Sequence, residues 1–156
     1  MSAKPVRMIG AVSMVAGAAT AAAGVAAWVA VRRQLRGEHI TVPAGAAFLP
    51  GRRVTGPLTA YAQAEAIRRN AEAATGGKSF ADLGELASQA KASGNEDLVK
   101  HYHEKRATAQ TASFLRASLM TSVIGFGVSA LVAGVGVLFG LIGWALFRLT
   151  RPGRTR

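Results

Sequence analysis

The sequence predicts an all-α membrane protein, in which two transmembrane helices are joined by a small, mostly helical extracytoplasmic segment. Three observations carry this prediction. Residues 8–31 and 117–147 contain no charged side chain, and each stretch exceeds the ~20 residues that a helix needs to cross a ~30 Å hydrocarbon core. Half of the 156 residues are apolar. All eight Asp and Glu residues lie between the two stretches.

The stretch 8–31 is predicted to be the first transmembrane helix, a signal anchor that follows a cytoplasmic tail of residues 1–7. A basic start and the pattern Ala21-x-Ala23 are also typical of a cleaved secretory signal peptide, which is the alternative. The apolar run continues to Val31, which is longer than the apolar region of an ordinary signal peptide. A retained anchor is therefore favoured.

Residues 32–116 are predicted to form the extracytoplasmic segment. Its beginning, residues 37–56, is rich in glycine and proline and is expected to be irregular chain or a single strand. Pro57 suits the first turn of a helix, because its missing N–H is not needed there. The pair Gly76-Gly77 is expected to end that helix.

Two more helix starts follow in the segment. Ser79 and Asp82 have the spacing of a capping box, in which each side chain accepts a hydrogen bond from the other residue's backbone. Asn95 can cap a third helix. No proline occurs between residues 96 and 147, so the third helix is expected to continue into the second span.

The second span, residues 117–147, is followed by the basic tail 148–156. Neither tail contains an acidic residue, and short basic flanks remain on the cytoplasmic side. We therefore expect a multi-pass protein of the cell membrane with both termini in the cytoplasm and with the tails against anionic lipid headgroups. Arg32, Arg33 and Arg36 lie on the opposite side in this orientation.

Small residues follow helical spacing along one face of each span. Helices in lipid associate by close packing, which small side chains permit. The face therefore predicts packing of the two spans on each other, on a second copy or on a larger membrane complex. The predicted helix-packing residues are Gly125, Ser129, Ala133, Gly136, Gly140 and Gly143 in the second span and Gly17, Ala21 and Gly24 in the first. Tyr61 and Arg116 are the predicted partner contacts.

Gly77-Lys78-Ser79 resembles the end of a phosphate-binding P-loop. That motif also needs a glycine five residues earlier, where this chain has Glu72, and it must follow a strand. A helix end followed by an N-cap explains the same residues. No nucleotide or other cofactor is predicted.

The three histidines do not have the spacing of a metal site. His101 and His103 are two residues apart on a predicted helix, so they point to different sides. A net charge of +11 is also typical of proteins that bind nucleic acid, but the basic residues here are dispersed and carry no recognisable motif. No metal, catalytic or nucleic-acid site is therefore predicted.

Three segments resemble a family of small two-span membrane proteins of high-GC Gram-positive bacteria. They are Gly56-Pro-Leu-Thr-Ala-Tyr61, residues 72–83, and Phe114-Leu-Arg-Ala-Ser-Leu119. Members are often labelled aromatic ring-opening dioxygenase. The resemblance implies the two-span fold. The label, taken at its word, implies an enzyme that holds non-haem iron with two histidines and a carboxylate, and it is the source of the metal-dependent alternative given below.

The function that we expect is that of a non-enzymatic membrane protein of the cell envelope. It would be an accessory or assembly component that acts through helix packing and through its extracytoplasmic segment. The alternatives are a metal-dependent enzyme of the ring-opening dioxygenase kind and a binder of lipid or another envelope ligand.

Overall fold

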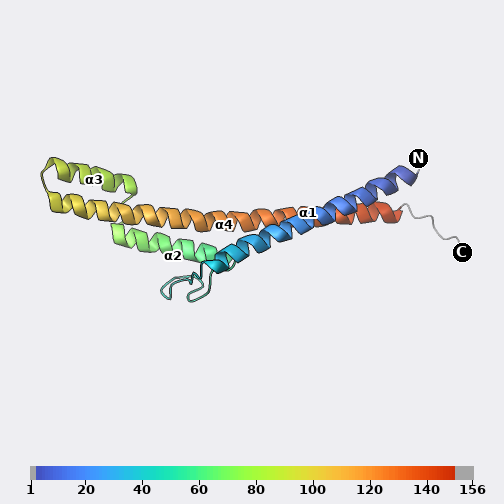
Figure 1. Ribbon diagram of the computed structural model, residues 1–156, viewed down its shortest axis with the longest axis horizontal. Helices are drawn as coiled ribbons and strands as arrows, with labels where there is room; N and C mark the ends of the chain where they lie inside the picture. Colours follow the sequence, from blue (N-terminus) through green and yellow to red (C-terminus); the bar gives the residue numbers. More distant parts are fainter. Residues whose placement is uncertain (1–2, 150–156) are drawn as a thin grey trace. The chain divides into compact units, whose positions relative to one another are not determined.

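The computed structural model describes residues 3–149 and is helical almost throughout (Figure 1). Its helices are α1 (Ala3–Gly37), α2 (Pro57–Thr75), α3 (Phe80–Ala92) and α4 (Glu96–Leu149). The described residues form no strand, only an isolated bridge between Thr41 and Arg53. The predicted all-α class is confirmed. Most of the predicted basic tail, including Arg151, Arg154 and Arg156, lies outside the described residues.

Two of the helices are long and apolar enough to cross a membrane. The most apolar windows of α1 and α4 have mean hydropathies of 1.8 and 2.3. Helix α1 continues beyond Val31 to Gly37. Helix α4 has 54 residues, or ~80 Å at 1.5 Å per residue, which is far more than a ~30 Å hydrocarbon core needs. The expectation of one helix from Glu96 into the second apolar stretch is confirmed.

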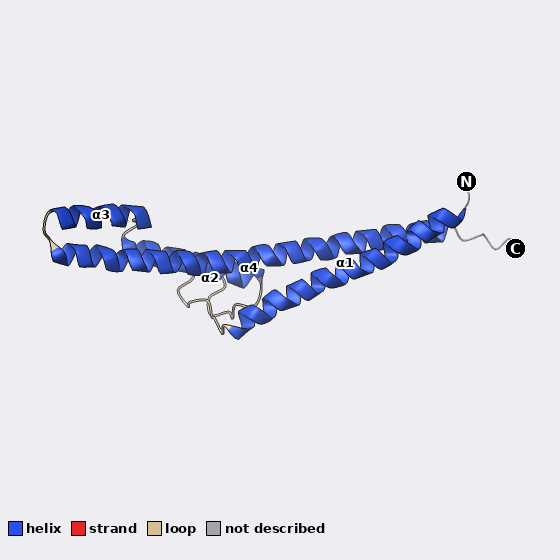
Figure 2. Ribbon diagram, turned by 45° about the horizontal axis from the view of Figure 1, so that its top comes forward, coloured by secondary structure: helices blue, strands red, loops and turns tan. Residues whose placement is uncertain are grey.

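The chain forms two compact units, and α1 and α4 contribute to both. One unit, here called the two-helix unit, contains α1 up to Gln34 and α4 from Ile124. The other, here called the helical segment, is Leu35–Val123 and contains α2, α3 and the first half of α4. Figure 2 shows that loops are confined to the connections of the helical segment.

The core of the helical segment is made mainly of small side chains. Helices α2 and α3 lie along the first half of α4 (Figures 1 and 2). The buried residues of the two short helices are Ala60, Ala62, Ala64, Ala66 and Thr75 in α2 and Leu83, Ala87 and Ala90 in α3. Alanine lets helices approach closely but removes little apolar surface from water, so this core contributes little stability for its length.

The predicted helix ends in the segment are confirmed. Pro57 opens α2, and Gly76 follows its end with a left-handed φ of 66°. Ser79 Oγ accepts from the Asp82 amide at 3.1 Å, and the Asp82 carboxylate accepts from the Ser79 amide at 2.8 Å. The Asn95 side chain accepts from the Leu98 amide at 3.1 Å. Local hydrogen-bonding chemistry therefore sets these ends.

Between α1 and α2 the chain turns back on itself in a small hairpin. The Val42 amide donates to the Arg52 carbonyl and the Val54 amide to the Ile40 carbonyl, both at 2.9 Å. Val42 and Val54 are each 1% exposed. The sequence analysis predicts irregular chain or a single strand here. The pairing has no clear local sign, because Val54 follows two arginines, Arg52 and Arg53, rather than an apolar run.

Candidate functional site: the glycine contact and the helical segment

Helices α1 and α4 touch within the two-helix unit along a row of glycines that recurs every seventh residue of α1. A Cβ atom on each of these glycines would lie 2.6–2.8 Å from a carbonyl oxygen of α4. Real Cβ atoms essentially never come within 3.0 Å of another heavy atom, so only glycine fits. The contacts pair Gly10 with Gly143, Gly17 with Gly136, and Gly24 with Ser129.

The pairing runs in opposite directions along the two helices, so α1 and α4 are antiparallel in this unit. Gly10 near the start of α1 meets Gly143 near the end of α4. The Arg7 guanidinium also lies 4.9 Å from the centre of the Phe147 ring. A seven-residue period is typical of helices that stay in contact over several turns. The described ends of α1 and α4, Ala3 and Leu149, are consequently at the same end of the two-helix unit.

The predicted packing residues of the second span do not contribute equally. A Cβ on Gly136 would lie 2.6 Å from the Gly17 carbonyl oxygen, and one on Gly143 would lie 2.6 Å from the Gly10 carbonyl oxygen. Gly140 is different, because a Cβ there would meet nothing within 4 Å, although its backbone is approached by Gly17. Gly136 and Gly140 are four residues apart, in the Gly-x-x-x-Gly spacing typical of packed membrane helices, but they face different surroundings.

The remaining predicted packing residues also lie at or beside the α1–α4 contact. The backbones of Ala21 and Ala133 face Gly136 and Gly24. Ser129 is 4% exposed, and its hydroxyl donates to the Gly125 carbonyl at 2.7 Å, so its polar group is satisfied within its own helix. A Cβ on Gly125 would make ordinary van der Waals contact with Val31, at 3.5 Å.

Two aromatic residues that the sequence reasoning missed extend the same contact. The rings of Trp28 and Phe126 meet edge to face with centroids 4.6 Å apart, a favourable arrangement for aromatic pairs. Phe126 is 1% exposed and is the largest fully buried side chain among the described residues. Trp28 follows Gly24 by one helical turn, which was an available signal that it continues the glycine face.

Tyr61 and Arg116, the predicted partner contacts, do not come together in one site. Tyr61 is half exposed on α2. Arg116 lines a hollow of about 350 Å³ that is also lined by the residues resembling a P-loop, Gly77, Lys78 and Ser79. Those residues form the end of one helix and the cap of the next, and no strand precedes them in the described chain.

The described residues contain one group of ion pairs, and it lies on α2. Arg68 donates to Glu65 at 2.6 Å and also contacts Glu72, while Arg69 donates to Glu65 at 3.1 Å. Hydrogen bonds from Arg68 and Arg69 lower the pKa of Glu65 to about 2. The partners are three and four residues apart on one helix and largely reach solvent, so the group supports the helix rather than a catalytic site.

The histidines do not form a metal centre with other side chains in residues 3–149. No group of three His, Asp or Glu side chains there could hold a metal ion. His101 and His103 are exposed on α4, and the His101 ring packs against that of Tyr102, with centroids 5.7 Å apart. His39 lies beyond the end of α1.

Comparison of the chain with family models, with curated proteins and with solved structures gave no match. The resemblance to the two-span bacterial family therefore stays a prediction.

Proposed function

We propose that this chain is a non-enzymatic integral membrane protein of the cell envelope, in which a membrane-spanning hairpin of α1 and α4 is joined to a small helical segment outside the membrane. It acts as an accessory or assembly component, and the helical segment is the part that meets its partners. The observation that carries the proposal is the outer surface of the two-helix unit, which is apolar and exposed in the part of the chain that the structure describes.

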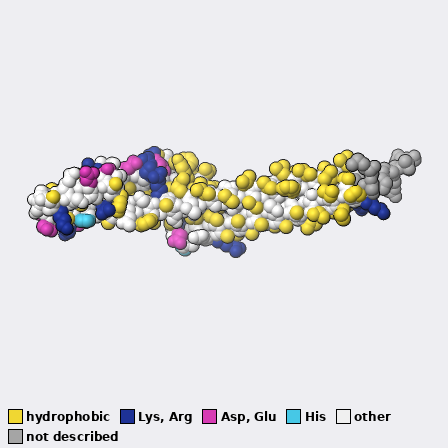
Figure 3. Space-filling view, turned by 90° about the horizontal axis from the view of Figure 1, so that it is seen from above, with side chains coloured by type: hydrophobic (Ala, Val, Ile, Leu, Met, Phe, Trp, Pro, Cys, Tyr) yellow, Lys and Arg dark blue, Asp and Glu magenta, His cyan; other side chains and the backbone are white. Residues whose placement is uncertain are grey.

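The large apolar side chains of α1 and α4 point mostly outward. Val15 is 72% exposed, Leu131 67% and Leu138 60%, and only 11% of each helix's most apolar window is buried. Hydrophobic side chains accordingly dominate the face of this unit seen in Figure 3. A core helix of a soluble protein would bury these side chains, whereas lipid chains solvate them.

The glycine contact supports a retained α1. Gly10, Gly17 and Gly24 fit against the α4 backbone at distances that leave no room for a side chain. Removal of α1 as a signal peptide would expose this face of α4, including Gly136 and Gly143. Because close packing is what holds helices together in lipid, a fitted contact over the length of the apolar stretch favours a signal anchor.

The antiparallel hairpin and the charges near its ends support an orientation with both termini in the cytoplasm. Lys4, Arg7 and Arg148 lie at the end of the hairpin that carries the termini, and no acidic residue accompanies them there. Short basic flanks stay inside, while a long segment between two spans is translocated largely regardless of its charge. The helical segment is then extracytoplasmic, and the basic tails meet anionic headgroups.

Membrane insertion and orientation can be tested in one set of experiments, because the chain contains no cysteine. The full-length protein should stay in the membrane fraction after alkaline carbonate extraction. A Gln110→Cys variant in intact cells should react with a membrane-impermeant maleimide, and a Lys4→Cys variant should react only after permeabilisation. Release by carbonate overturns the proposal, and the reverse labelling pattern overturns the orientation.

Retention of α1 and the accessory role need two further measurements. Mass spectrometry of the intact purified protein should give the mass of a chain that keeps residues 8–31. Affinity purification in mild detergent should recover further copies of the chain or other envelope proteins in fixed ratio. Removing the exposed side chain of Tyr61 by Tyr61→Ala should reduce that recovery, while the exposed Leu58→Ala serves as a control on the same helix. A chain that purifies alone under every mild condition is not an assembly component.

A further inference from the structure

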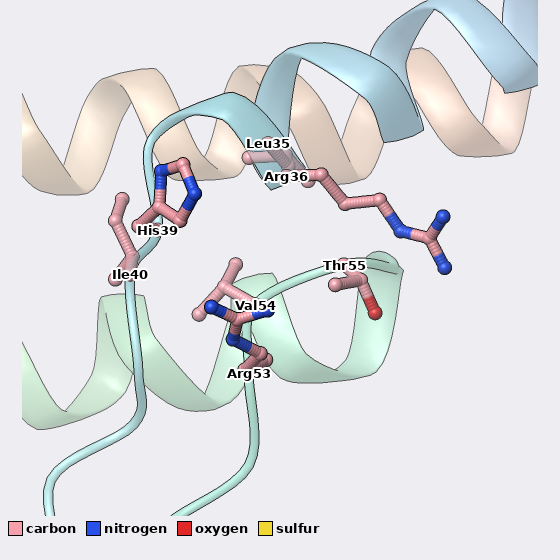
Figure 4. A pocket seen from close by; sticks show the side chains of 7 residues that line it. All are labelled: Leu35, Arg36, His39, Ile40, Arg53, Val54 and Thr55. Atoms are coloured by element: carbon pink, nitrogen blue, oxygen red, sulfur yellow. The ribbon is translucent and has the colours of Figure 1, made fainter.

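We infer that the pocket at the end of α1 binds a phosphate group, the one carried by the headgroup of an anionic phospholipid. The pocket has a volume of about 250 Å³, which is smaller than the ~300–1,000 Å³ of pockets for larger ligands. Its lining residues are Leu35, Arg36, His39, Ile40, Arg53, Val54 and Thr55 (Figure 4). The inference rests on the proposed membrane insertion of α1, because that insertion brings headgroups to this level of the helix.

The pocket is built by the end of α1 and by the hairpin that follows it. His39 adopts a left-handed φ of 52°, an uncommon conformation for a residue other than glycine, and this reverses the chain after Gly37. The hairpin then returns Arg53 to the end of the helix. Figure 4 shows Arg36 in the last turn of α1, His39 just after the helix, and Arg53 on the facing part of the hairpin. The Arg36 side chain extends past Thr55, so its guanidinium lies away from the His39 ring and from Arg53.

The two arginines that line the pocket form no ion pair with a carboxylate of the described residues. The ion pairs of residues 3–149 involve only Arg68 and Arg69 with their glutamates, so neither Arg36 nor Arg53 is paired with a carboxylate. The pocket lining contains no acidic residue. Guanidinium groups are the charged, forked donors that bind phosphate oxygens best. The Arg53 guanidinium faces the end of α1, and the long Arg36 side chain has to turn towards it for both to hold one phosphate.

His39 and Thr55 adapt the site to an anion in different ways. The His39 Nδ1 lies 2.7 Å from the Gly37 carbonyl oxygen, and since a carbonyl only accepts, the ring donates to it. The His39 amide also donates to the Arg36 carbonyl, at 3.3 Å. These bonds occupy carbonyl oxygens at the negative end of the helix, which would otherwise repel an anion. The Thr55 hydroxyl makes no hydrogen bond to the described residues and remains as a donor.

The apolar wall of the pocket explains the choice of a lipid over a free anion. Leu35 and Val54 form the floor of this wall and are 5% and 1% exposed, so the partly exposed Ile40 supplies most of its accessible apolar surface, which suits glycerol and ester carbons rather than water. The pocket begins at Leu35, one helical turn after the uncharged stretch ends at Val31. A membrane-inserted α1 would bring lipid headgroups to this point of the chain.

The test uses the full-length protein in neutral detergent, where no charged bilayer surface attracts the ligand. A soluble short-chain phosphatidylglycerol, the matching phosphatidylcholine and inorganic phosphate are titrated in separate arms and followed by native mass spectrometry or calorimetry. We expect one site that prefers phosphatidylglycerol. Saturable binding of phosphate with equal or higher affinity would transfer the site to a free anion and overturn the lipid assignment. Binding of neither ligand would overturn the site.

Matched double variants separate a built site from general charge attraction. Arg36→Gln/Arg53→Gln removes two charges from the pocket, and Arg33→Gln/Arg52→Gln removes two nearby charges that do not line it. The pocket variant should lose about tenfold or more in affinity, since each charge-assisted hydrogen bond contributes this much, and the control variant less than about threefold. Equal losses overturn the site. Circular dichroism must show the same helix content in both variants.

Carbonate extraction of the same variants separates this inference from the proposed function. If the wild-type chain is released from the membrane, both the proposed function and the lipid site are wrong. If the wild type stays in the membrane and the pocket variant binds the phosphatidylglycerol as well as the wild type does, only the lipid site fails.

Discussion

Replacing Gly136 with alanine should loosen the contact between α1 and α4, whereas the same replacement at Gly140 should not. The new Cβ at Gly136 would lie 2.6 Å from the Gly17 carbonyl oxygen, and nearer still to the Ala21 amide nitrogen. Ordinary contacts of a Cβ begin at 3.4 Å, so the shortfall at the carbonyl oxygen is 0.8 Å. Both obstacles are backbone atoms, so no side chain can move aside and the helices must separate locally.

The magnitude follows from two opposed terms. Overpacking of this kind costs ~1–3 kcal/mol, and the better helix propensity of alanine returns up to ~1 kcal/mol. Gly136→Ala should therefore destabilise the hairpin by about 1–2 kcal/mol. Gly140→Ala raises the helix propensity in the same way but causes no clash, because nothing lies within 4 Å of its Cβ position. It should be neutral or should stabilise the hairpin by up to ~1 kcal/mol.

The measurement is equilibrium unfolding in mixed micelles of a mild detergent and sodium dodecyl sulfate. Trp28 reports on the contact, because its ring packs against Phe126, and a Trp144→Phe background removes the only other tryptophan. The reasoning is refuted if Gly140→Ala destabilises as much as Gly136→Ala. If Gly140→Ala leaves unfolding unchanged but weakens association between copies, the open side of Gly140 belongs to an interface with another chain.

Three further outcomes are expected. Helix content measured by circular dichroism should fall as the pH drops from about 4.5 towards about 2. The Glu65 pKa is lowered from 4.5 to about 2, so the ionised carboxylate stabilises the helix fully above pH 4.5 and loses this contribution as it is protonated. Glu65→Gln should flatten the pH dependence, and a curve that the substitution leaves unchanged would contradict the prediction. Ser79→Ala should speed amide hydrogen exchange in α3, because it removes the hydrogen bond to the Asp82 amide and weakens the cap by ~1 kcal/mol. The control is Ser88→Ala, which removes a hydroxyl that bonds within the helix and should not speed exchange. Equal effects of the two substitutions would exclude the cap as the cause. Phe126→Ala should destabilise the hairpin in the mixed-micelle assay by less than the ~3–5 kcal/mol typical of soluble cores, because lipid chains replace part of the lost contact. If the substitution leaves the stability of the hairpin unchanged, the contact with Trp28 does not form.

Local chemistry made most of the helix boundaries predictable. The Ser79–Asp82 capping box, the Asn95 cap and the glycines after α2 depend on residues within a few positions of each other, and such hydrogen bonds form in the same way in most contexts. The hairpin of residues 40–54 was not predictable in this way. Its pairing joins segments about ten residues apart, with one buried valine in each, and neither segment alternates long enough to mark a strand.

In the candidate packing site, too, the sequence predicted the face of the helix but not the role of each residue on it. Sequence spacing placed Gly136 and Gly140 on one face and treated them alike, because residues four apart lie within about 40° of each other on a helix. Where two helices approach closely, this difference in direction decides the outcome. A Cβ on Gly136 would clash with backbone atoms of the other helix, whereas a Cβ on Gly140 would point into open space. The sequence reasoning also missed Trp28 and Phe126, whose roles depend on which residue stands opposite.

By itself, the sequence determined that this chain is helical, that two of its helices are long and apolar enough to cross a bilayer, and where the helices of the segment begin and end. These properties are sums over neighbouring residues, namely hydropathy, length and capping, and they need no partner. Only the tertiary structure decided which glycines are irreplaceable, and that Arg36 and Arg53 line one pocket. Those facts depend on the rotation of one helix against another and on the return of a loop, and residue spacing along a single element does not contain that information.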